Sequence, residues 1–155
     1  MLEQLPQLTR WNAWANRQVL ETLRASSGEP PEALAAYQHV LETELVWLRR
    51  MTNDPQPMLK LWGPASLANC EAWTTEASGL WTTLLASLDA EGLERTFTYR
   101  NSTGQEFTDR LAEPTLQTLF HSSQYRGEAA AFLNHDGHRA PDLDFIYWLR
   151  LGSPE

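Results

Sequence analysis

The residues whose type and spacing most clearly suggest a chemical function are two histidines in two separate helical stretches. His121 is followed four residues later by Tyr125 within the stretch Leu116 to Leu133, and His39 lies in an earlier helical run. Residues four apart on a helix share a face, so their side chains can converge on one ion. Imidazole is a common ligand of zinc, nickel and iron. His39 and His121 are therefore a plausible start for a metal site, and Tyr125 occupies the second position of the i, i+4 pair.

The third position of this candidate site is chemically weak. A neutral phenol such as that of Tyr125 is a poor ligand for zinc or nickel. Two carboxylates fall in register and could substitute for it, Glu42 one turn beyond His39 and Glu128 about two turns beyond His121. Such carboxylates are more often solvated charges, and the positions of the histidines also fit plain solvent exposure. Spacing alone leaves these alternatives open.

Four stretches have the periodicity of amphipathic helices, in which apolar residues recur at steps of three and four. They run from Leu5 to Arg24, from Pro31 to Met51, from about Ala65 to Leu88, and from Pro114 to a glycine cap at Gly137. Proline suits the first turn of a helix and glycine its C-terminal end, which supports these boundaries. The pattern predicts four packed helices.

The last of these runs carries two stripes when each residue advances the helix by ~100°. One stripe holds Leu116, Phe120, Ser123, Gly127 and Ala130, and the other holds His121, Tyr125, Glu128 and Phe132. On the second run, His39 lies ~140° away from the leucine stripe by the same step. We therefore expect the histidines to lie off the main core stripe, where they could line an open groove.

Two segments depart from the helical pattern. Phe97 and Tyr99 alternate with polar residues, and the turn sequence Asn101 to Gly104 follows them, which predicts a β-hairpin between the third and fourth helices. The tail from Pro141 to Arg150 is too apolar to remain free and is expected to pack on the helices. The sequence thus predicts an all-α fold, a four-helix bundle with a short β-hairpin before the last helix, as one domain over residues 1–155.

Composition narrows the partners and the location. The chain has 12 basic and 20 acidic residues and a formal net charge of −8, which repels phosphate backbones and anionic membranes. No apolar run reaches the ~20 residues that a membrane span needs, and the first residues lack the layout of a signal peptide. We therefore expect a cytoplasmic protein with no nucleic-acid and no membrane partner.

Three other residues have structural explanations. Cys70 is the single cysteine, which fits a reducing compartment, and a lone cysteine is more often a core residue than a nucleophile. His135 and His138 flank Gly137, where imidazoles can bond the last carbonyls of a helix. The sequence contains no Gly-rich phosphate loop, Ser–His–Asp pattern or CxxC pair that would indicate another chemistry.

Four motifs follow one another in an order that is typical of a known family. They are WNAWANRQVLETL near the start, HVLETELVWLRRM in the second helical run, HSSQYRGEAAAFL in the fourth and GHRAPDLDFIYWLR at the end. Each motif alone is weak, but together they resemble the DinB/YfiT-like superfamily over nearly the whole chain. The resemblance implies a four-helix bundle, and because dimers are common in such families we also expect a homodimer.

The resemblance also implies a site and a chemistry. The usual metal site of the family has one histidine from the second helix and two from the fourth; His39 and His121 match two of them, and Tyr125 occupies the third position. Glu128 stands where the family has glutamine. Characterised relatives are transferases and isomerases that use low-molecular-weight thiols such as bacillithiol or mycothiol. A bound metal could lower the pKa of such a thiol.

Three functions fit these observations. The first is a small-ligand-binding or weakly metal-binding protein whose metal site is degenerate because Tyr125 replaces a histidine. The alternative is a divalent-metal-dependent thiol S-transferase of the bacillithiol type, or a hydrolase-like enzyme, with nickel, zinc or iron on His39 and His121. The third is a protein that acts mainly by self-association through its seven tryptophans, and it is compatible with either of the others.

Overall fold

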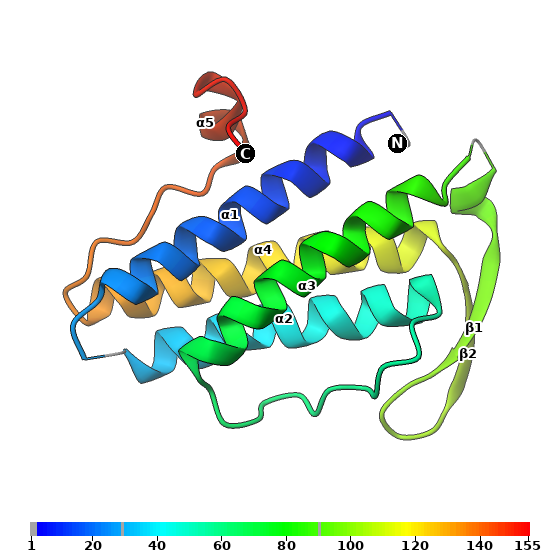
Figure 1. The fold of residues 1–155 in the computed structure, drawn as a ribbon, viewed down its shortest axis with the longest axis horizontal. Helices are drawn as coiled ribbons and strands as arrows, with labels where there is room; N and C mark the ends of the chain where they lie inside the picture. The colour runs from blue at the N-terminus through cyan, green and yellow to red at the C-terminus, as the bar shows by residue number, and fades with distance from the viewer. Residues whose placement is uncertain (1–2, 29, 90) are drawn as a thin grey trace.

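Four long helices make up most of the protein in the computed structural model, which describes residues 3–28, 30–89 and 91–155. The helices are α1 (Leu5–Ala25), α2 (Pro31–Thr52), α3 (Leu67–Ala86) and α4 (Ala112–His135), and a short helix α5 (Phe145–Arg150) follows. A one-turn 3₁₀ helix η1 (Gly92–Glu94) and two strands, β1 (Thr96–Arg100) and β2 (Glu106–Arg110), lie between α3 and α4. The predicted helical class and the hairpin are confirmed (Figure 1).

The helix ends follow the local sequence chemistry. Pro31 begins α2, as predicted, and Ser66 caps α3 by accepting a hydrogen bond from the backbone N–H of Asn69. α4 begins at Ala112, so Pro114 lies in its first turn. Proline is tolerated there because the N–H that it lacks would have no helical partner. Gly137 follows α4 with φ of 83°, which glycine adopts without strain, as the sequence predicts for the cap.

The long helices pack laterally, with α2 against α3 and α4, and α1 against the same two helices. α2 is enclosed around its whole circumference, since no residue from Ala33 to Met51 is exposed. The link between α2 and α3 runs back along α2 and covers its outer face (Figure 1). His39 is therefore only 4% exposed, so the expectation that it lines an open groove is wrong.

The inward face of α4 also differs from the predicted stripe. Phe120 is 68% exposed, and Ser123 and Gly127 are exposed as well. The buried residues of α4 are instead Ala112, Pro114, Thr115, Thr118, Leu119, Ser122, Arg126, Ala129 and Leu133. Several of them are polar side chains that bond inside the protein, as when Thr118 donates to the carbonyl of Pro114, so hydrophobicity alone does not mark this face.

The two departures from the helical pattern have the predicted structures. β1 and β2 form an antiparallel pair in which Thr98 faces Thr108, and Gly104 in the connecting turn has φ of 83°. The tail returns to α1, where Trp148 is fully buried against Trp14 and Ala15. Within the described residues, no helix combines the length and the apolar character that crossing a membrane would require.

Candidate functional site

His39 of α2 and His121 of α4 meet across the interface between these two helices. Their ring centroids lie 5.2 Å apart, and the Tyr125 ring lies 4.6 Å from each of them. His121 and Tyr125 are half-buried, one helical turn apart. The predicted convergence of the three residues is therefore confirmed, while their role as metal ligands stays a prediction.

Trp62 is a fourth ring at this place, and the sequence pattern did not mark it. Its indole stacks on the His39 imidazole with centroids 3.8 Å apart and planes 12° from parallel. Its backbone has φ of 58°, a left-handed conformation that is uncommon for a bulky residue. We call the four residues His39, Trp62, His121 and Tyr125 the His39 cluster.

Glu42 fixes the position of Trp62. Its carboxylate is 1% exposed and accepts hydrogen bonds from the backbone N–H of Trp62 at 2.7 Å and of Gly63 at 3.4 Å. The side chain of Gln38 donates to the same carboxylate at 3.0 Å. Glu42 Oε2 also lies 3.6 Å from Nδ1 of His39. Glu42 thus holds the link between α2 and α3 against α2 through these hydrogen bonds.

Gln38 holds the next part of that link. Its side-chain oxygen accepts from the backbone N–H of Ser66 at 2.9 Å, and its nitrogen donates to the carbonyl of Pro64 at 3.2 Å. His39 therefore lies within about one turn of Gln38 and Glu42, two side chains of α2 that bond to the link. Neither Gln38 nor Trp62 could be selected from periodicity, since their contacts join residues 20 or more positions apart.

Burial sets the charge of the two histidines. Desolvation lowers the pKa of His39 below its ordinary value of 6.5, and Glu42 and Glu128 oppose this shift only in part. Desolvation also lowers the pKa of His121, and the nearby His39 lowers it further. Both imidazoles are therefore neutral at neutral pH, the state in which an imidazole nitrogen can bind a metal or accept a hydrogen bond.

Both histidines have an unused polar atom. Among the described residues, Nδ1 of His121 and Nδ1 of His39 are buried and have no hydrogen-bond partner, and the carboxylate nearest to Nδ1 of His39, that of Glu42, is 3.6 Å away, beyond hydrogen-bond length. An unpaired buried polar atom is costly, and a bound group would remove that cost. The two orphaned nitrogens are the strongest sign of a binding function at the His39 cluster.

Comparison with protein-family models, with curated proteins and with solved structures gave no match. The likeness of the motifs to the DinB/YfiT-like superfamily therefore stays a prediction.

A complete set of metal ligands is not assembled around the two histidines. Among the described residues, no three or more His, Cys, Asp or Glu side chains converge as metal ligands would. Glu42 is engaged by the link, and Glu128 is exposed on α4. The donor set of the cluster is thus two imidazoles and one phenol.

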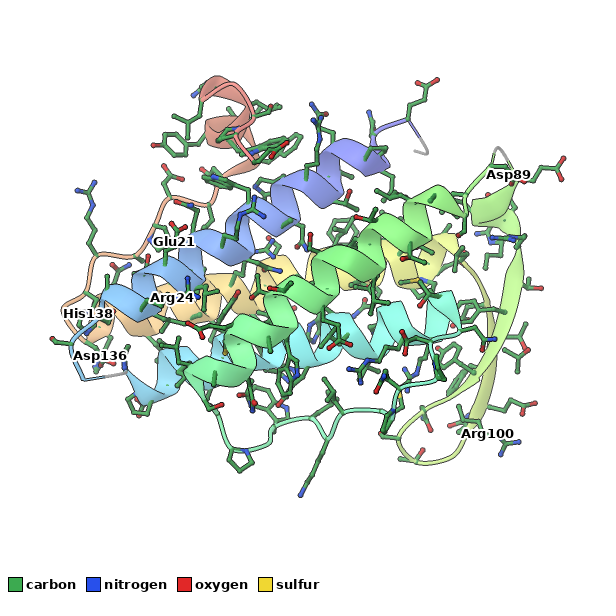
Figure 2. The ribbon with its side chains drawn as sticks, viewed as in Figure 1. Glu21, Arg24, Asp89, Arg100, Asp136 and His138 are labelled. Carbon is green, nitrogen blue, oxygen red and sulfur yellow. The ribbon has the colours of Figure 1, made fainter. Side chains whose placement is uncertain are left out.

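The remaining candidate residues lie away from this site. His135 is 85% exposed in its side chain and pairs with Asp136, and Figure 2 shows Asp136 and His138 beyond the end of α4. The helix end is capped by the backbone N–H of His138, which donates to the carbonyl of Leu133, and not by an imidazole. Cys70 is fully buried, and burial raises the pKa of its thiol to about 12, so it suits a core position rather than a nucleophile.

Proposed function

We propose that the protein is a DinB-like four-helix bundle that binds a small ligand at the His39 cluster and binds a divalent metal there only weakly. The observation that carries the proposal is the pair of buried Nδ1 atoms, on His39 and His121, that have no hydrogen-bond partner in the described parts of the chain. A ligand with a hydroxyl, amide or carbonyl group could bond to these nitrogens. The rings of Trp62 and Tyr125 would contact its flat or apolar part.

The donor chemistry supports weak rather than tight metal binding. Two neutral imidazoles leave the other positions of a zinc or nickel ion to water or to the phenol of Tyr125, which is a poor ligand while protonated. The carboxylate of Glu42, which could replace the phenol, already accepts the backbone N–H groups of Trp62 and Gly63 and the side-chain amide of Gln38. The set of residues therefore fits a metal incompletely, and we derive no catalytic step from one.

The alternative is a divalent-metal-dependent thiol S-transferase of the bacillithiol type. The observation that favours it is the same pair of neutral imidazoles, because neutral histidines bind metal without first losing a proton. A bound ion would supply Lewis acidity and lower the pKa of the thiol. This function requires an ion held at one per chain.

Elemental analysis of protein purified without an affinity tag separates the two functions. We expect zinc, nickel and iron together at far less than one ion per chain. A small-molecule screen read by NMR of the histidine ring signals should then yield ligands that shift His39 and His121. The matched control is the exposed His135, whose signals should not move. One tightly held ion per chain would refute the proposal in favour of the transferase.

A further inference from the structure

A buried polar network joins α1, α2, α3 and α4 and does not include the residues of the His39 cluster. The carboxylate of Glu44 accepts hydrogen bonds from the side chains of Asn12 at 2.7 Å, Asn16 at 2.9 Å and Trp81 at 2.5 Å. Nη1 of Arg126 donates to the side-chain oxygens of the same two asparagines, at 2.6 and 2.8 Å. The asparagines thus connect a buried anion to a buried cation.

The guanidinium of Arg126 is only partly used by this network. Arg126 is 1% exposed, yet its Nη2 has no hydrogen-bond partner among the residues that the structure describes. The guanidinium carbon lies 5.1 Å from the centre of the Trp11 ring, an arrangement that favours the cation but offers no hydrogen-bond acceptor. A buried, charged donor without an acceptor is costly, so an acceptor from a ligand that reached Nη2 would remove that cost.

A cavity of about 400 Å³ lies next to Arg126. It is lined by Trp11, Ser123, Arg126, Gly127, Leu143, Asp144 and Phe145. The tail closes one side, because the indole N–H of Trp11 donates to the carbonyl of Leu143 at 3.0 Å. The Phe145 ring meets the Trp11 ring edge to face, with centroids 5.8 Å apart. The cavity therefore has aromatic walls and a buried arginine, and its volume is typical of a small-ligand site.

We propose that this cavity binds a small molecule with a carboxylate on a flat apolar body. The carboxylate would accept a charge-assisted hydrogen bond from Nη2 of Arg126, for which carboxylate is a preferred partner. The flat body would lie against Trp11 and Phe145. Asp144, at the same cavity, carries a like charge and weakens the binding of an anion. The arrangement selects carboxylates by the arginine and limits their affinity by the aspartate.

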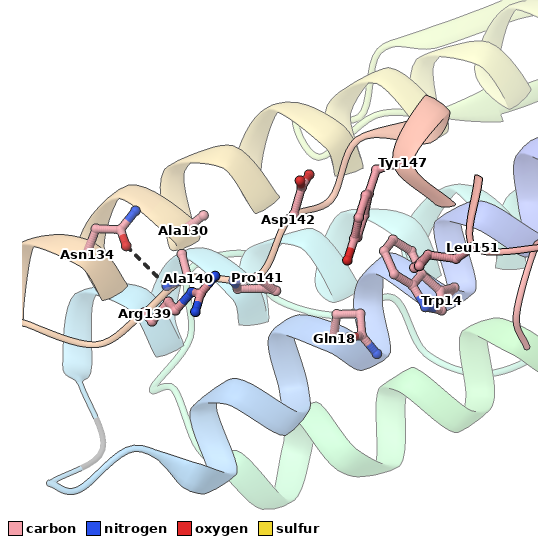
Figure 3. Close-up of a pocket in the computed structure, with 10 residues that line it drawn as sticks. All are labelled: Trp14, Gln18, Ala130, Asn134, Arg139, Ala140, Pro141, Asp142, Tyr147 and Leu151. Atoms are coloured by element: carbon pink, nitrogen blue, oxygen red, sulfur yellow. Dashed lines mark hydrogen bonds between the residues drawn. The ribbon is translucent and has the colours of Figure 1, made fainter. Parts of the chain in front are cut away.

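The neighbouring cavity does not offer the same recognition. It has a volume of about 500 Å³, and Figure 3 shows Asp142, Tyr147, Gln18 and Trp14 around it. The side chain of Asn134 there already accepts from the backbone N–H of Ala140. Among the described residues that line this cavity, none has a buried side-chain atom without a hydrogen-bond partner. Of these two cavities, only the one at Arg126 has a lining residue with a buried, unpartnered donor.

This site is independent of the His39 cluster. At ~100° per residue, Ser123 and Gly127 lie on the opposite side of α4 from His121 and Tyr125. The cavity is bounded by α1 and the tail, whereas the His39 cluster is bounded by α2 and the link to α3. A failed test at one site leaves the proposal for the other unchanged.

Benzoate and its neutral analogue benzamide are suitable probes. Titration of the full chain, followed by NMR, should show benzoate shifting the indole N–H of Trp11 and the amide of Gly127. Benzamide should bind about tenfold more weakly, because it lacks the charge that strengthens a bond to guanidinium. The Asp144→Asn variant should bind benzoate several-fold more tightly than the parent does. No binding of benzoate, or equal binding of the two probes, would overturn the proposal.

Filling the cavity provides a test that leaves Arg126 intact. A Cβ atom on Gly127 would meet nothing within 4 Å, so Gly127→Leu should fold and occupy the cavity. This variant should lose benzoate binding. Gly79→Leu is the matched control, since Gly79 is also a helical glycine with open space around it but lies on α3. Unchanged benzoate binding by Gly127→Leu would contradict the assignment of the site, and so would an equal loss in Gly79→Leu.

Discussion

The indole of Trp62 lies flat on the imidazole of His39, with ring centroids 3.8 Å apart and planes 12° from parallel. Trp62 holds this position in a left-handed backbone conformation, with φ of 58°, and its backbone N–H donates a hydrogen bond to the carboxylate of Glu42. Glu42 lies three residues after His39 on α2, so one helical turn carries the covered ring and the carboxylate that secures the cover. A single substitution, at Trp62 or at Glu42, should therefore be enough to disrupt the stack.

Removing the indole should change the ionisation of His39. In the Trp62→Ala variant the imidazole would be more exposed to water, so we expect the pKa of His39 to rise toward 6.5. The measurement is an NMR titration of the His39 ring signals. Met58→Ala is the matched control, because Met58 is an exposed apolar residue of the same link, 47% accessible. An unchanged pKa in Trp62→Ala would show that the stack does not desolvate His39.

His39, which is buried, and His121, which is half-buried, should also make stability depend on pH. Their pKa values are below 6.5 in the folded protein, and near 6.5 in the unfolded chain. As the pH falls below about 6.5, the unfolded chain binds more protons than the folded protein, so the free energy of unfolding decreases until the folded-state pKa values are reached. Above that range the two residues add no pH dependence.

Urea denaturation between about pH 7.5 and pH 5.5 measures this effect. The double variant His39→Gln and His121→Gln should lose less stability over this range than the parent protein. His135→Gln, at an exposed position, is the control and should keep the slope of the parent. If the double variant and the parent have the same slope, the buried histidines do not contribute to acid sensitivity.

The network between Glu44 and Arg126 should be strongly coupled. Arg126→Met would leave the carboxylate of Glu44 buried without its balancing cation, at a cost of about 3–5 kcal/mol. Adding Glu44→Gln should cost less than the sum of the single effects, because the second change removes the unbalanced charge. Urea unfolding of the parent, both single variants and the double variant gives the coupling energy.

A surface pair supplies the comparison for this cycle. Arg24 and Glu71 form an ion pair whose side chains are 49% and 41% exposed. Substituting Arg24 by Ala should cost less than about 1 kcal/mol, since water screens exposed pairs. Strictly additive effects for Glu44 and Arg126 would mean that the asparagines do not transmit the interaction between the two charges.

The helices and the hairpin could be predicted because their signals are local. Apolar steps of three and four residues, Pro31 at a helix start and Gly137 after a helix end are properties of neighbouring residues. The alternation around Phe97 is likewise local, and β1 is present there. The apolar tail could be expected to pack for the simple reason that Trp148 would be costly to expose.

The burial of particular faces could not be predicted in this way. His39 is buried because Trp62, 23 positions later, folds over it, and Arg126 is buried because Asn12 and Asn16 of α1 accept its hydrogen bonds. Phe120 is exposed although it is more hydrophobic than Arg126, which is buried on the same helix. Contacts between distant segments decide these outcomes, and helical periodicity carries no information about them.

The identity of residue 125 is the most direct test of metal binding. The Tyr125 ring lies 4.6 Å from the rings of both His39 and His121, so a ligand at this position would face the same point as the two imidazoles. Tyr125→His would place two imidazoles four residues apart on α4 and opposite His39, and histidine is small enough to fit the half-buried site. We expect its affinity for nickel or zinc to exceed that of the parent by about tenfold or more, because a third nitrogen ligand replaces water or phenol.

Calorimetric titration of the parent, Tyr125→His and Tyr125→Phe measures the change, and the phenylalanine variant controls for loss of the phenol by keeping the ring without a donor atom. If the parent already binds one ion as tightly as Tyr125→His, residue 125 is not the missing ligand. In that case Glu42 or Glu128 completes the site, and the metal-dependent transferase becomes the better function.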